Sequence, residues 1–497
     1  MLMSTKVIVI GSGFSGLSAA TNLAHKGFNV TLLEKNDQPG GRARSFSVDG
    51  YKFDMGPSWY WMPDVFENYF SIFGKKVSDY YQLTRLDPSY RVYFRKSDFI
   101  DLPASLQRLY ALFEEIEPGS GSKLESFIAE SAYKYDTGMK DLVYMPGRKL
   151  SELADVRLFK GLFQLHLLKS MRSYVHAHFK NERLRQIVEF PILFLGGTPQ
   201  NTPALYSLMN YADMALGTWY PDGGMHEIVK AMVQLAKEKG VEIVLDEEVK
   251  SFEFESNEIS AVITENQKYE AEIVVAGADY HHVEQNLLPE KFRQYSPSYW
   301  DKRKMAPSSL LFYLGINKKI KGLLHHTLFF DESFDEHAEE IYKNPKWPSK
   351  PLFYVSCTSK TDASVAPEGC ENLFLLMPVA PDLKDDIFTR EKYYEVMMDR
   401  LEKLTGENIK DHVVYKKSYA QKDFVSDYHS FKGNAYGLAN TLTQTAHLKP
   451  GMKSKKVDNL YYTGQLTVPG PGVPPSLISG QVVALEVEKE QLKKQRV

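Results

Sequence analysis

The 497-residue sequence contains only two cysteines, no long apolar run and almost no net charge. Cys357 and Cys370 are too few for a disulfide framework or a zinc cluster, so we expect two reduced thiols and no metal site. The formal net charge of −3 provides no basic field that would attract nucleic acid. No run approaches the roughly 18 apolar residues that a membrane-spanning helix needs. The sequence therefore argues against a disulfide scaffold, a nucleic-acid-binding protein and an integral membrane protein.

The first ten residues could be mistaken for a signal peptide, but their apolar run is short. This run leads directly into a glycine motif rather than into a cleavage site. We therefore expect the protein to be made and kept in a reducing, cytoplasmic compartment.

The length and the pattern of apolar residues predict a protein of several lobes with both helices and sheets. At 497 residues the chain is too long for one simple core, so two or three lobes are expected. Aromatic residues make up 13%, which suits a large apolar cavity, although a large core would use the same residues. Periodicity predicts a strand at Lys6–Ile10, a helix at Gly13–Lys26 and a strand at Asn29–Glu34. Further strands are predicted at Gly240–Phe254, Glu258–Ala278, Ser308–Ile316, Leu352–Cys357 and Asn372–Val379.

A glycine motif lies between the first predicted strand and the first predicted helix. The segment Gly11–Gly16 fits G-x-G-x-x-G, in which the glycines permit a tight turn, a close pyrophosphate and close packing of the helix on the strand. The helix N-terminus offers free N–H groups and a partial positive charge to phosphates. Glu34 ends the next strand, where a carboxylate accepts hydrogen bonds from a ribose diol. This context predicts a dinucleotide-binding βαβ unit.

Two further turns favour FAD over NAD as the dinucleotide. Gly40–Arg42 follows Glu34 closely, so a second glycine pair can approach the same pyrophosphate and Arg42 can compensate its charge. Phe53–Ser58 then provides another turn that could reach a bulky ring system. A simple nicotinamide-binding domain would continue with a plain crossover helix instead.

The C-terminal region repeats the order of strand, glycine turn and helix. A strand is predicted at Asn459–Gly464, a Gly/Pro loop at Val468–Pro475 and a helix at Ser476–Val487. Glycines allow close packing on a flat ring, and the helix N-terminus would favour negative charge on a reduced flavin. A proline-rich surface turn is the other interpretation of this loop.

Taken together, these motifs resemble the bacterial-type phytoene desaturases of the flavin-dependent carotenoid desaturase and isomerase family. The resemblance covers nearly the whole chain, and the motifs follow the same order. Besides the motifs above, it includes Gly217–Met225, Ala276–Asp279 with His282, Leu324–His326, Asp362–Gly369 and Pro469–Ser479.

The resemblance implies an α/β fold with a Rossmann-type FAD-binding domain of the glutathione-reductase-like or amine-oxidase-like type. A β-sheet substrate domain and a helical lid complete the expected architecture. The FAD-binding domain is expected to comprise residues 1–90, 216–300 and 426–497. The helical lid and membrane-facing region is expected at 91–215, and the substrate-binding sheet at 301–425.

The resemblance also assigns residues to the cofactor. Glu34 would hold the adenosine ribose, and Val249 would meet the adenine with its backbone. Arg42 and Ser58 would lie along the diphosphate and flavin. The expected FAD-binding residues are Gly11, Ser12, Gly13, Phe14, Ser15, Gly16, Glu34, Lys35, Gly41, Arg42, Gly56, Pro57, Ser58, Val249, Asp279, Gly464, Val473 and Pro474.

The implied reaction is FAD-dependent removal of hydrogen from a C40 polyene, most simply phytoene converted towards lycopene or neurosporene. A hydride would leave to flavin N5, and an adjacent proton would be lost to a base or to water. The resemblance further implies peripheral attachment to the membrane that holds the substrate, and oxygen or quinone as the terminal electron acceptor. Because a hydrocarbon has no polar handle, we expect an aromatic and aliphatic tunnel.

The sequence does not identify the catalytic base. The pattern becomes helical around Pro146, and a lid helix is expected over Asp155–Phe179. The candidates in this lid region are Glu152, Asp155 and His166. Each candidate is also typical of a solvated charge on a helix surface. The segment Leu158–Tyr174 mixes apolar and basic residues, which suits either an interfacial helix or a buried lid helix.

Other functions on the same fold stay open. A hydroxycarotenoid 3,4-desaturase, a carotenoid isomerase, a retinoid saturase or an amine oxidase would keep the flavin and change the chemistry. A non-enzymatic prenyl or lipid carrier would lose part of the flavin apparatus, whereas this chain retains both ends of it. His325 and His326 are adjacent, which disfavours a metal pair because neighbouring residues on a strand point to opposite faces, and a structural role is expected.

Overall fold

The first strand, β1 (Lys6–Ile10), lies in the middle of a five-stranded parallel sheet. The structure is a computed structural model that describes residues 5–139, 143–146, 169–441, 444 and 448–495. The sheet has the order β19-β13-β1-β2-β9, and all its neighbouring pairs are parallel. Three distant parts of the chain build it, which confirms the predicted Rossmann-type fold. Its other strands are β2 (Asn29–Leu33), β9 (Glu242–Val244), β13 (Ile273–Ala276) and β19 (Leu460–Tyr462).

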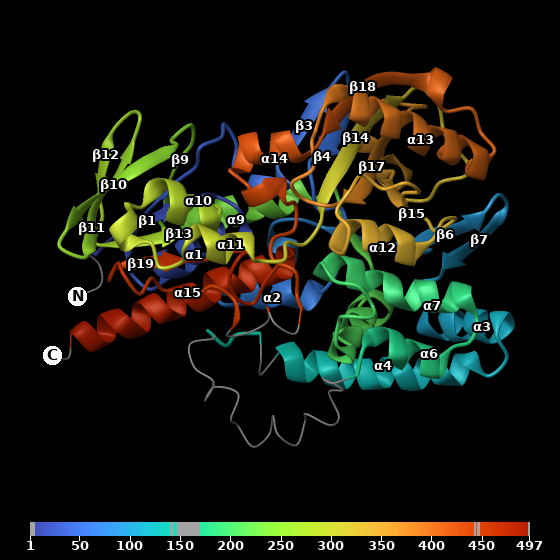
Figure 1. The fold of residues 1–497 in the computed structure, drawn as a ribbon, viewed down its shortest axis with the longest axis horizontal. Helices are drawn as coiled ribbons and strands as arrows, with labels where there is room; N and C mark the ends of the chain where they lie inside the picture. The colour runs from blue at the N-terminus through green and yellow to red at the C-terminus, as the bar shows by residue number, and fades with distance from the viewer. Residues whose placement is uncertain (1–4, 140–142, 147–168, 442–443, 445–447, 496–497) are drawn as a thin grey trace.

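Two helices from opposite ends of the chain, α1 (Phe14–His25) and α15 (Val473–Lys494), pack against each other in this lobe (Figure 1). The Ser18 hydroxyl on α1 donates a hydrogen bond to the Leu477 carbonyl on α15 at 2.7 Å. Helix α15 begins before the predicted start at Ser476, because prolines are tolerated in the first turn of a helix, where their missing N–H has no partner to lose.

A second sheet has seven strands in the order β18-β14-β17-β16-β15-β6-β7. Only the pair of β15 and β6 is parallel, and the other neighbours are antiparallel. The bounds of β14 agree with the predicted strand, and every residue in it is buried. The strands of this sheet are β6 (Tyr90–Arg95), β7 (Asp98–Leu102), β14 (Ser308–Ile316), β15 (His326–Phe329), β16 (Phe353–Ser356), β17 (Glu371–Val379) and β18 (Val413–Tyr419).

The two faces of this sheet have different neighbours. On one face, Leu310, Phe312 and Leu314 join a core with Met397 and Leu401 of the long helix α13 (Ile387–Thr405). Side chains alternate along a strand, so the residues between them point to the opposite face. That opposite face looks towards the other lobe and forms one wall of a cavity.

The region expected to be helical over residues 91–215 begins instead with strands β6 and β7. Both belong to the seven-stranded sheet, because β6 pairs with β15 more than 230 residues away in the sequence, as in the pair Val92 and Leu328. The helical part starts only after them. It consists of α3 (Leu106–Ile116), α4 (Ser120–Thr137), α6 (Met171–His178) and α7 (Glu182–Glu189), gathered at one end of the molecule (Figure 1).

The prediction of a single lid helix over Asp155–Phe179 is wrong for the C-terminal part of that range. Ser170 is not helical: it forms an isolated β-bridge with Pro203 and caps α6, where its side chain accepts a hydrogen bond from the Ser173 N–H. A separate helix therefore begins at Met171. The three candidate bases, Glu152, Asp155 and His166, lie outside the described residues, and their roles stay untested.

Among the remaining elements, β10 (Val249–Glu255), β11 (Glu258–Thr264) and β12 (Lys268–Glu270) form a three-stranded antiparallel sheet. Within the described residues, no helix is both long enough and apolar enough to cross a membrane. The remaining strands are β3 (Ser45–Val48), β4 (Tyr51–Asp54), β5 (Leu83–Arg85) and β8 (Trp219–Pro221). The remaining α-helices are α2 (Pro63–Ser71), α8 (Leu208–Asn210), α9 (His226–Glu238), α10 (Tyr280–His282), α11 (Pro297–Asp301), α12 (Phe334–Tyr342) and α14 (Gln421–Tyr428).

Candidate active site

One cavity extends from the five-stranded sheet to the seven-stranded sheet. Its volume of about 430 Å³ falls within the usual range of small-molecule sites. One part, which we call the nucleotide end, is lined by Gly11, Gly13, Glu34, Arg42 and Asp279. The other part, which we call the apolar end, is lined by Trp59, Leu311, Phe330, Tyr354 and Phe374. A dinucleotide site and a hydrophobic chamber are therefore continuous.

The three motif glycines occupy different surroundings. A Cβ on Gly16 would lie 1.9 Å from the Gly11 carbonyl oxygen, so helix α1 can approach the strand only with glycine there. A Cβ on Gly13 would meet no protein atom within 4 Å, because Gly13 faces the cavity. Gly16 thus serves packing, and Gly13 leaves room for a ligand against the backbone.

Glu34 directly follows β2 as a buried carboxylate that lines the cavity. Its Oε2 accepts hydrogen bonds from the Ser12 N–H at 2.8 Å and the Ser12 hydroxyl at 2.6 Å. Its Oε1 accepts from the Asn36 N–H at 3.0 Å and from Asn36 Nδ2 at 2.7 Å. These donors fix the carboxylate, whose remaining lone pairs can accept from ribose hydroxyls. Ser12 lies behind Glu34 and positions it.

Arg42 and Asp279 face each other at the nucleotide end. The Arg42 Nη2 donates to the Ser430 hydroxyl at 2.9 Å, but its buried Nε has no hydrogen-bond partner among the described residues. Burial raises the pKa of Asp279 to about 6, and Arg42 opposes that shift. A buried guanidinium with an unused donor at a cavity wall fits an anionic group such as a diphosphate. The residues present therefore fit the dinucleotide that the sequence predicts.

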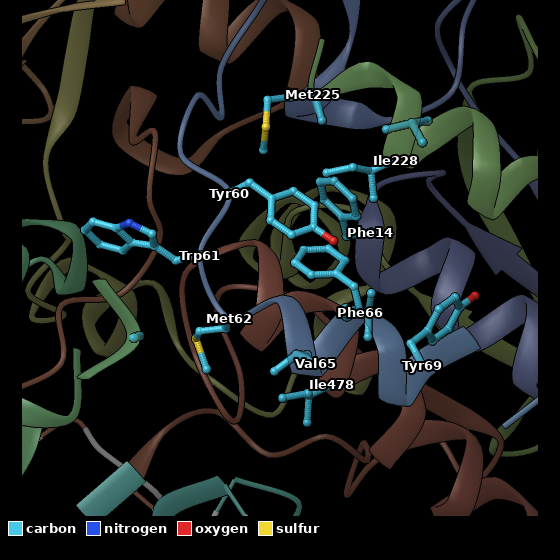
Figure 2. Close-up of a cluster of buried hydrophobic side chains, with 14 of the residues drawn as sticks. Phe14, Tyr60, Trp61, Met62, Val65, Phe66, Tyr69, Met225, Ile228 and Ile478 are labelled. Carbon is cyan, nitrogen blue, oxygen red and sulfur yellow. The ribbon is translucent and has the colours of Figure 1, made fainter. Parts of the chain in front are cut away.

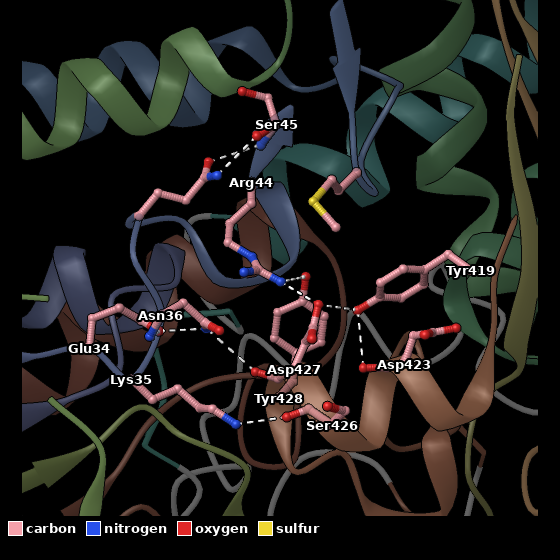
Figure 3. Close-up of polar contacts among 12 residues, drawn as sticks. Glu34, Lys35, Asn36, Arg44, Ser45, Tyr419, Asp423, Ser426, Asp427 and Tyr428 are labelled. Atoms are coloured by element: carbon pink, nitrogen blue, oxygen red, sulfur yellow. Dashed lines mark hydrogen bonds and ion pairs between the residues drawn. The ribbon is translucent and has the colours of Figure 1, made fainter. Parts of the chain in front are cut away.

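Helix α14 approaches the nucleotide end from the seven-stranded-sheet lobe (Figure 3). Arg44 forms an ion pair with Asp427, which also accepts a hydrogen bond from the Tyr419 hydroxyl at 2.9 Å. Lys35 Nζ donates to the Ser426 carbonyl at 2.7 Å. No local motif in the sequence predicts that Arg44 pairs with Asp427 or that Lys35 bonds to Ser426, because the partners are nearly 400 residues apart.

The C-terminal glycine loop forms the opposite side of the nucleotide end. The Gly464 N–H donates to the Ser479 hydroxyl at 3.0 Å, and a Cβ on Gly464 would lie 3.1 Å from Ser15 Oγ. Helix α15 begins after Gly472 without a side-chain cap, which leaves the Val473 N–H to a ligand, whereas Pro474 and Pro475 carry no N–H and the Ser476 N–H bonds to the Gly472 carbonyl at 3.0 Å. The N-termini of α1 and α15 therefore open onto the same cavity.

The predicted cofactor residues gather in one place. All of them line this cavity except Ser12, which holds Glu34, and Gly16, which packs α1 on its strand. Val249 opens β10 and lines the cavity beside Glu248. Their individual contacts with FAD atoms stay predictions.

The apolar end is built by alternation along β-strands. Leu311 of β14 and Phe374 and Leu376 of β17 present their side chains to the cavity. The segment after the Phe53–Ser58 turn alternates in the same way (Figure 2). Tyr60 points into a core where it stacks on Phe66 of α2 at 4.5 Å, whereas Trp61 points away to line the cavity.

A buried carboxylic acid supports the Trp61 wall. Asp213 accepts hydrogen bonds from the Tyr90 hydroxyl at 2.8 Å and from the Thr218 hydroxyl at 3.3 Å, while Trp61 Nε1 donates to Thr218 at 2.8 Å. Burial raises the pKa of Asp213 from 3.8 to about 7. The folded protein therefore binds this proton more tightly than the unfolded chain does.

This raised pKa predicts a pH-dependent loss of stability. The contribution of protonated Asp213 to the free energy of unfolding is fully present below about pH 4 and declines as the pH rises through 7, because ionisation of Asp213 in the folded state is disfavoured. The wild-type protein should lose stability between pH 5 and pH 8, and we expect this loss to be about 2 kcal/mol smaller in Asp213→Asn. Urea unfolding at both pH values measures this difference. An identical pH dependence in the variant and the wild-type protein would contradict the assignment.

Comparison with known proteins gives the family. The model of the family described as flavin containing amine oxidoreductase matches residues 14–487. A carotenoid 3,4-desaturase of Haloarcula japonica is 43% identical over 484 residues, which cover 97% of this chain and 98% of that protein. A zeta-carotene-forming phytoene desaturase of Myxococcus xanthus is 32% identical over 96% of this chain and 93% of that protein.

A solved structure shares the fold at low sequence identity. An oxidoreductase from Methanosarcina mazei superposes with a TM-score of 0.63 at 15% identity, over 96% of this chain and 99% of that one. Together with the glycine-lined cavity, these matches establish FAD as the cofactor and an oxidoreductase as the class of enzyme. This chain belongs to the flavin containing amine oxidoreductase family and, within it, to the bacterial-type carotenoid desaturases.

Proposed function

We propose that this enzyme desaturates a carotenoid: it removes two hydrogens from adjacent carbons of a long polyene and leaves a new C=C bond. The observation that carries the proposal is the single cavity, in which the nucleotide end is continuous with the apolar end. Bound FAD supplies a two-electron acceptor. The polypeptide must bind the hydrocarbon, orient it and exclude water.

The apolar end suits these tasks. Burial of apolar surface contributes about 25 cal/mol per Å², and a membrane already provides most of this to a lipid-soluble substrate. The walls therefore need to match lipid in polarity, which the rings of Trp59, Phe330 and Phe374 do. The fixed face of the seven-stranded sheet can orient a rigid conjugated chain along the strands.

Two positions of desaturation are candidates. Conversion of phytoene towards neurosporene or lycopene is the first, and it is the reaction type in the name of the Myxococcus xanthus relative. Desaturation at the 3,4 position is the second, and the higher identity of the Haloarcula japonica enzyme, 43% against 32%, favours it.

Attachment to a membrane surface and the use of oxygen or quinone as the final acceptor belong to the same proposal. A C40 hydrocarbon is confined to lipid, so an enzyme without a spanning helix in its described part must meet the bilayer at its surface. Flotation of the holoprotein with liposomes tests this point, since an enzyme that stays at the bottom of the gradient in their presence does not bind them.

The reaction itself is tested with holoprotein and polyene-loaded liposomes. We expect phytoene or a more unsaturated carotenoid to yield products lighter by two hydrogens per step, detected by chromatography with mass spectrometry. Unchanged mass with altered retention would indicate an isomerase, and added hydrogens would indicate a saturase. A protein that binds the polyene but converts none of it would support a carrier and contradict the proposal.

A further inference from the structure

The histidine pair His325–His326 lies behind the apolar end of the cavity. His326 is fully buried at the start of β15, and its ring stacks on Trp59 at 4.0 Å with an interplanar angle of 11°. Its Nδ1 lies 2.6 Å from the hydroxyl of Tyr354, which lines the cavity. His326 pairs with Ser356 across the strands, so Tyr354 occupies the diagonal position on the same face. The Tyr354 hydroxyl at the cavity wall is thus within hydrogen-bond distance of the buried His326 imidazole.

Two other titratable groups that line the apolar end, His337 and Tyr342, are not arranged in this way. His337 uses both ring nitrogens on the backbone: Nε2 contacts the Pro378 carbonyl at 2.9 Å, and Nδ1 accepts from the Leu352 N–H at 3.0 Å. The buried Tyr342 hydroxyl has no hydrogen-bond partner among the residues that the structure describes. Neither group can therefore take up a proton and pass it on.

Tyr354 also lies beside the expected flavin site. The Ser58 side chain, at the end of the Gly56–Ser58 turn, lies close to the Tyr354 side chain. Ser58 and Tyr354 both line the cavity. The phenol oxygen is therefore at the junction of the nucleotide end and the apolar end, where a reacting carbon would have to be.

Polar groups also surround His325, but among the described residues Nε2 of both histidines has no hydrogen-bond partner, so no hydrogen bond joins the two rings. The rings of His325 and His326 meet at 4.5 Å, and His325 Nδ1 lies 2.7 Å from the Thr361 hydroxyl. Thr361 is exposed, and the next residue, the half-buried Asp362, accepts a hydrogen bond from the Tyr220 hydroxyl at 3.1 Å. Tyr220 in turn packs against His325 at 4.7 Å. These contacts hold the His325 ring in place beside His326.

We propose that Tyr354 accepts the proton that the polyene loses and passes its own phenol proton to His326; this inference rests on the proposed desaturation. When a hydride has left one carbon for the cofactor, the neighbouring C–H bond breaks and its electron pair forms the C=C bond. That proton binds the Tyr354 oxygen while the phenol's own proton moves to His326 Nδ1. Tyr354 ends neutral, and after the product leaves, the imidazolium returns its proton through the Tyr354 hydroxyl to water that enters the cavity.

The weak basicity of the buried histidines is compatible with this role. Burial lowers the pKa of His326 well below its ordinary value and lowers that of His325 to about 3. A C–H bond next to a carbocation is a much stronger acid than an imidazolium, so even a weak base removes its proton. A weakly basic imidazole also gives the proton up readily, which resets the site for the next step.

Two variants test the proposal in the FAD-loaded enzyme. Tyr354→Phe keeps the ring and removes the hydroxyl, and His326→Gln keeps an acceptor for the Tyr354 hydroxyl but cannot carry a proton. We expect desaturation to slow by about 100-fold in both, with FAD content and polyene KM retained. Cations that are not deprotonated should be captured by water, which gives by-products heavier than the alkene by one water.

The matched control is Tyr393→Phe, which removes a buried hydroxyl bonded to the Pro348 carbonyl at 2.7 Å on the opposite face of the sheet. It should keep the wild-type rate. Nitrogen-15 NMR of the histidine-labelled protein gives a readout without turnover: Tyr354→Phe should shift the one Nδ1 resonance that His326→Gln abolishes.

The outcomes distinguish the role of Tyr354 from the desaturase activity itself. Conversion by Tyr354→Phe at the wild-type rate, or no shift of the His326 resonance, overturns the inference and leaves desaturation intact. A slow Tyr354→Phe enzyme with a raised KM and no hydrated product would indicate a binding role, and it too overturns the inference. Failure of the wild-type holoprotein to convert any polyene overturns the proposed function itself.

Discussion

Replacing Gly13 by alanine is expected to abolish tight FAD binding while leaving the apoprotein folded. The new methyl group would meet no protein atom within 4 Å, and the φ of −66° at Gly13 suits any residue. The methyl would instead project into the cavity where the diphosphate is expected. We expect a loss of about 100-fold in affinity, or about 3 kcal/mol. Quenching of tryptophan fluorescence on titration with FAD measures it, since Trp59 and Trp61 line the cavity.

The stability of the apoprotein separates a local clash from a folding defect. Alanine is a poorer N-cap than glycine, so Gly13→Ala should lower the free energy of unfolding by no more than about 1 kcal/mol. Gly451→Ala is the matched control, because its Cβ would lie 3.7 Å from the nearest neighbouring atom, the Lys453 carbonyl oxygen, and Gly451 does not line the cavity. Unchanged FAD affinity in Gly13→Ala would mean that no dinucleotide lies against this backbone.

Gly480→Ala is expected to damage the fold and the cofactor site together. A Cβ on Gly480 would lie 2.4 Å from the Ser15 carbonyl oxygen and 2.7 Å from the Ala19 nitrogen, both of them backbone atoms of α1. The helices can relieve this clash only by moving apart, which displaces both N-termini that open onto the nucleotide end. We expect a loss of about 3 kcal/mol of stability, together with loss of FAD.

An exposed position on the same helix provides the control for Gly480→Ala. Leu485 is 39% exposed, and Leu485→Ala should change the free energy of unfolding by less than about 0.5 kcal/mol. Urea unfolding of the apoproteins and the flavin absorbance of the purified holoproteins give both readouts. If Gly480→Ala retained wild-type stability and FAD, the close packing of α1 on α15 would not be what fixes the two helix N-termini at the nucleotide end.

The parts of this protein that could be predicted from sequence are those with a local signature. The turn at Gly11–Gly16 follows from its glycine spacing, and the strand at Ser308–Ile316 follows from the apolar run Leu310–Leu314, whose short length suits a fully buried strand. The resemblance then placed the C-terminal loop against the same cofactor. Most of the predicted cofactor residues therefore line one cavity.

The contacts that escaped prediction join segments far apart in the chain. Nothing local marks Asp427 as the partner of Arg44, or β6 as the neighbour of β15. The same holds for His326 and Tyr354, which the sequence shows as an unexplained histidine and one aromatic among many. Such pairings are set by how the lobes pack, and local propensity does not encode them.

The central claim is that FAD and a polyene occupy one continuous cavity, so that the polyene can reduce the flavin directly. Anaerobic mixing of holoprotein with carotenoid-loaded liposomes tests this in a single turnover. We expect the absorption band of the oxidised flavin to bleach as one new double bond forms per FAD. A flavin that remains oxidised in the presence of every carotenoid tried, while an added chemical reductant still bleaches it, would contradict the claim.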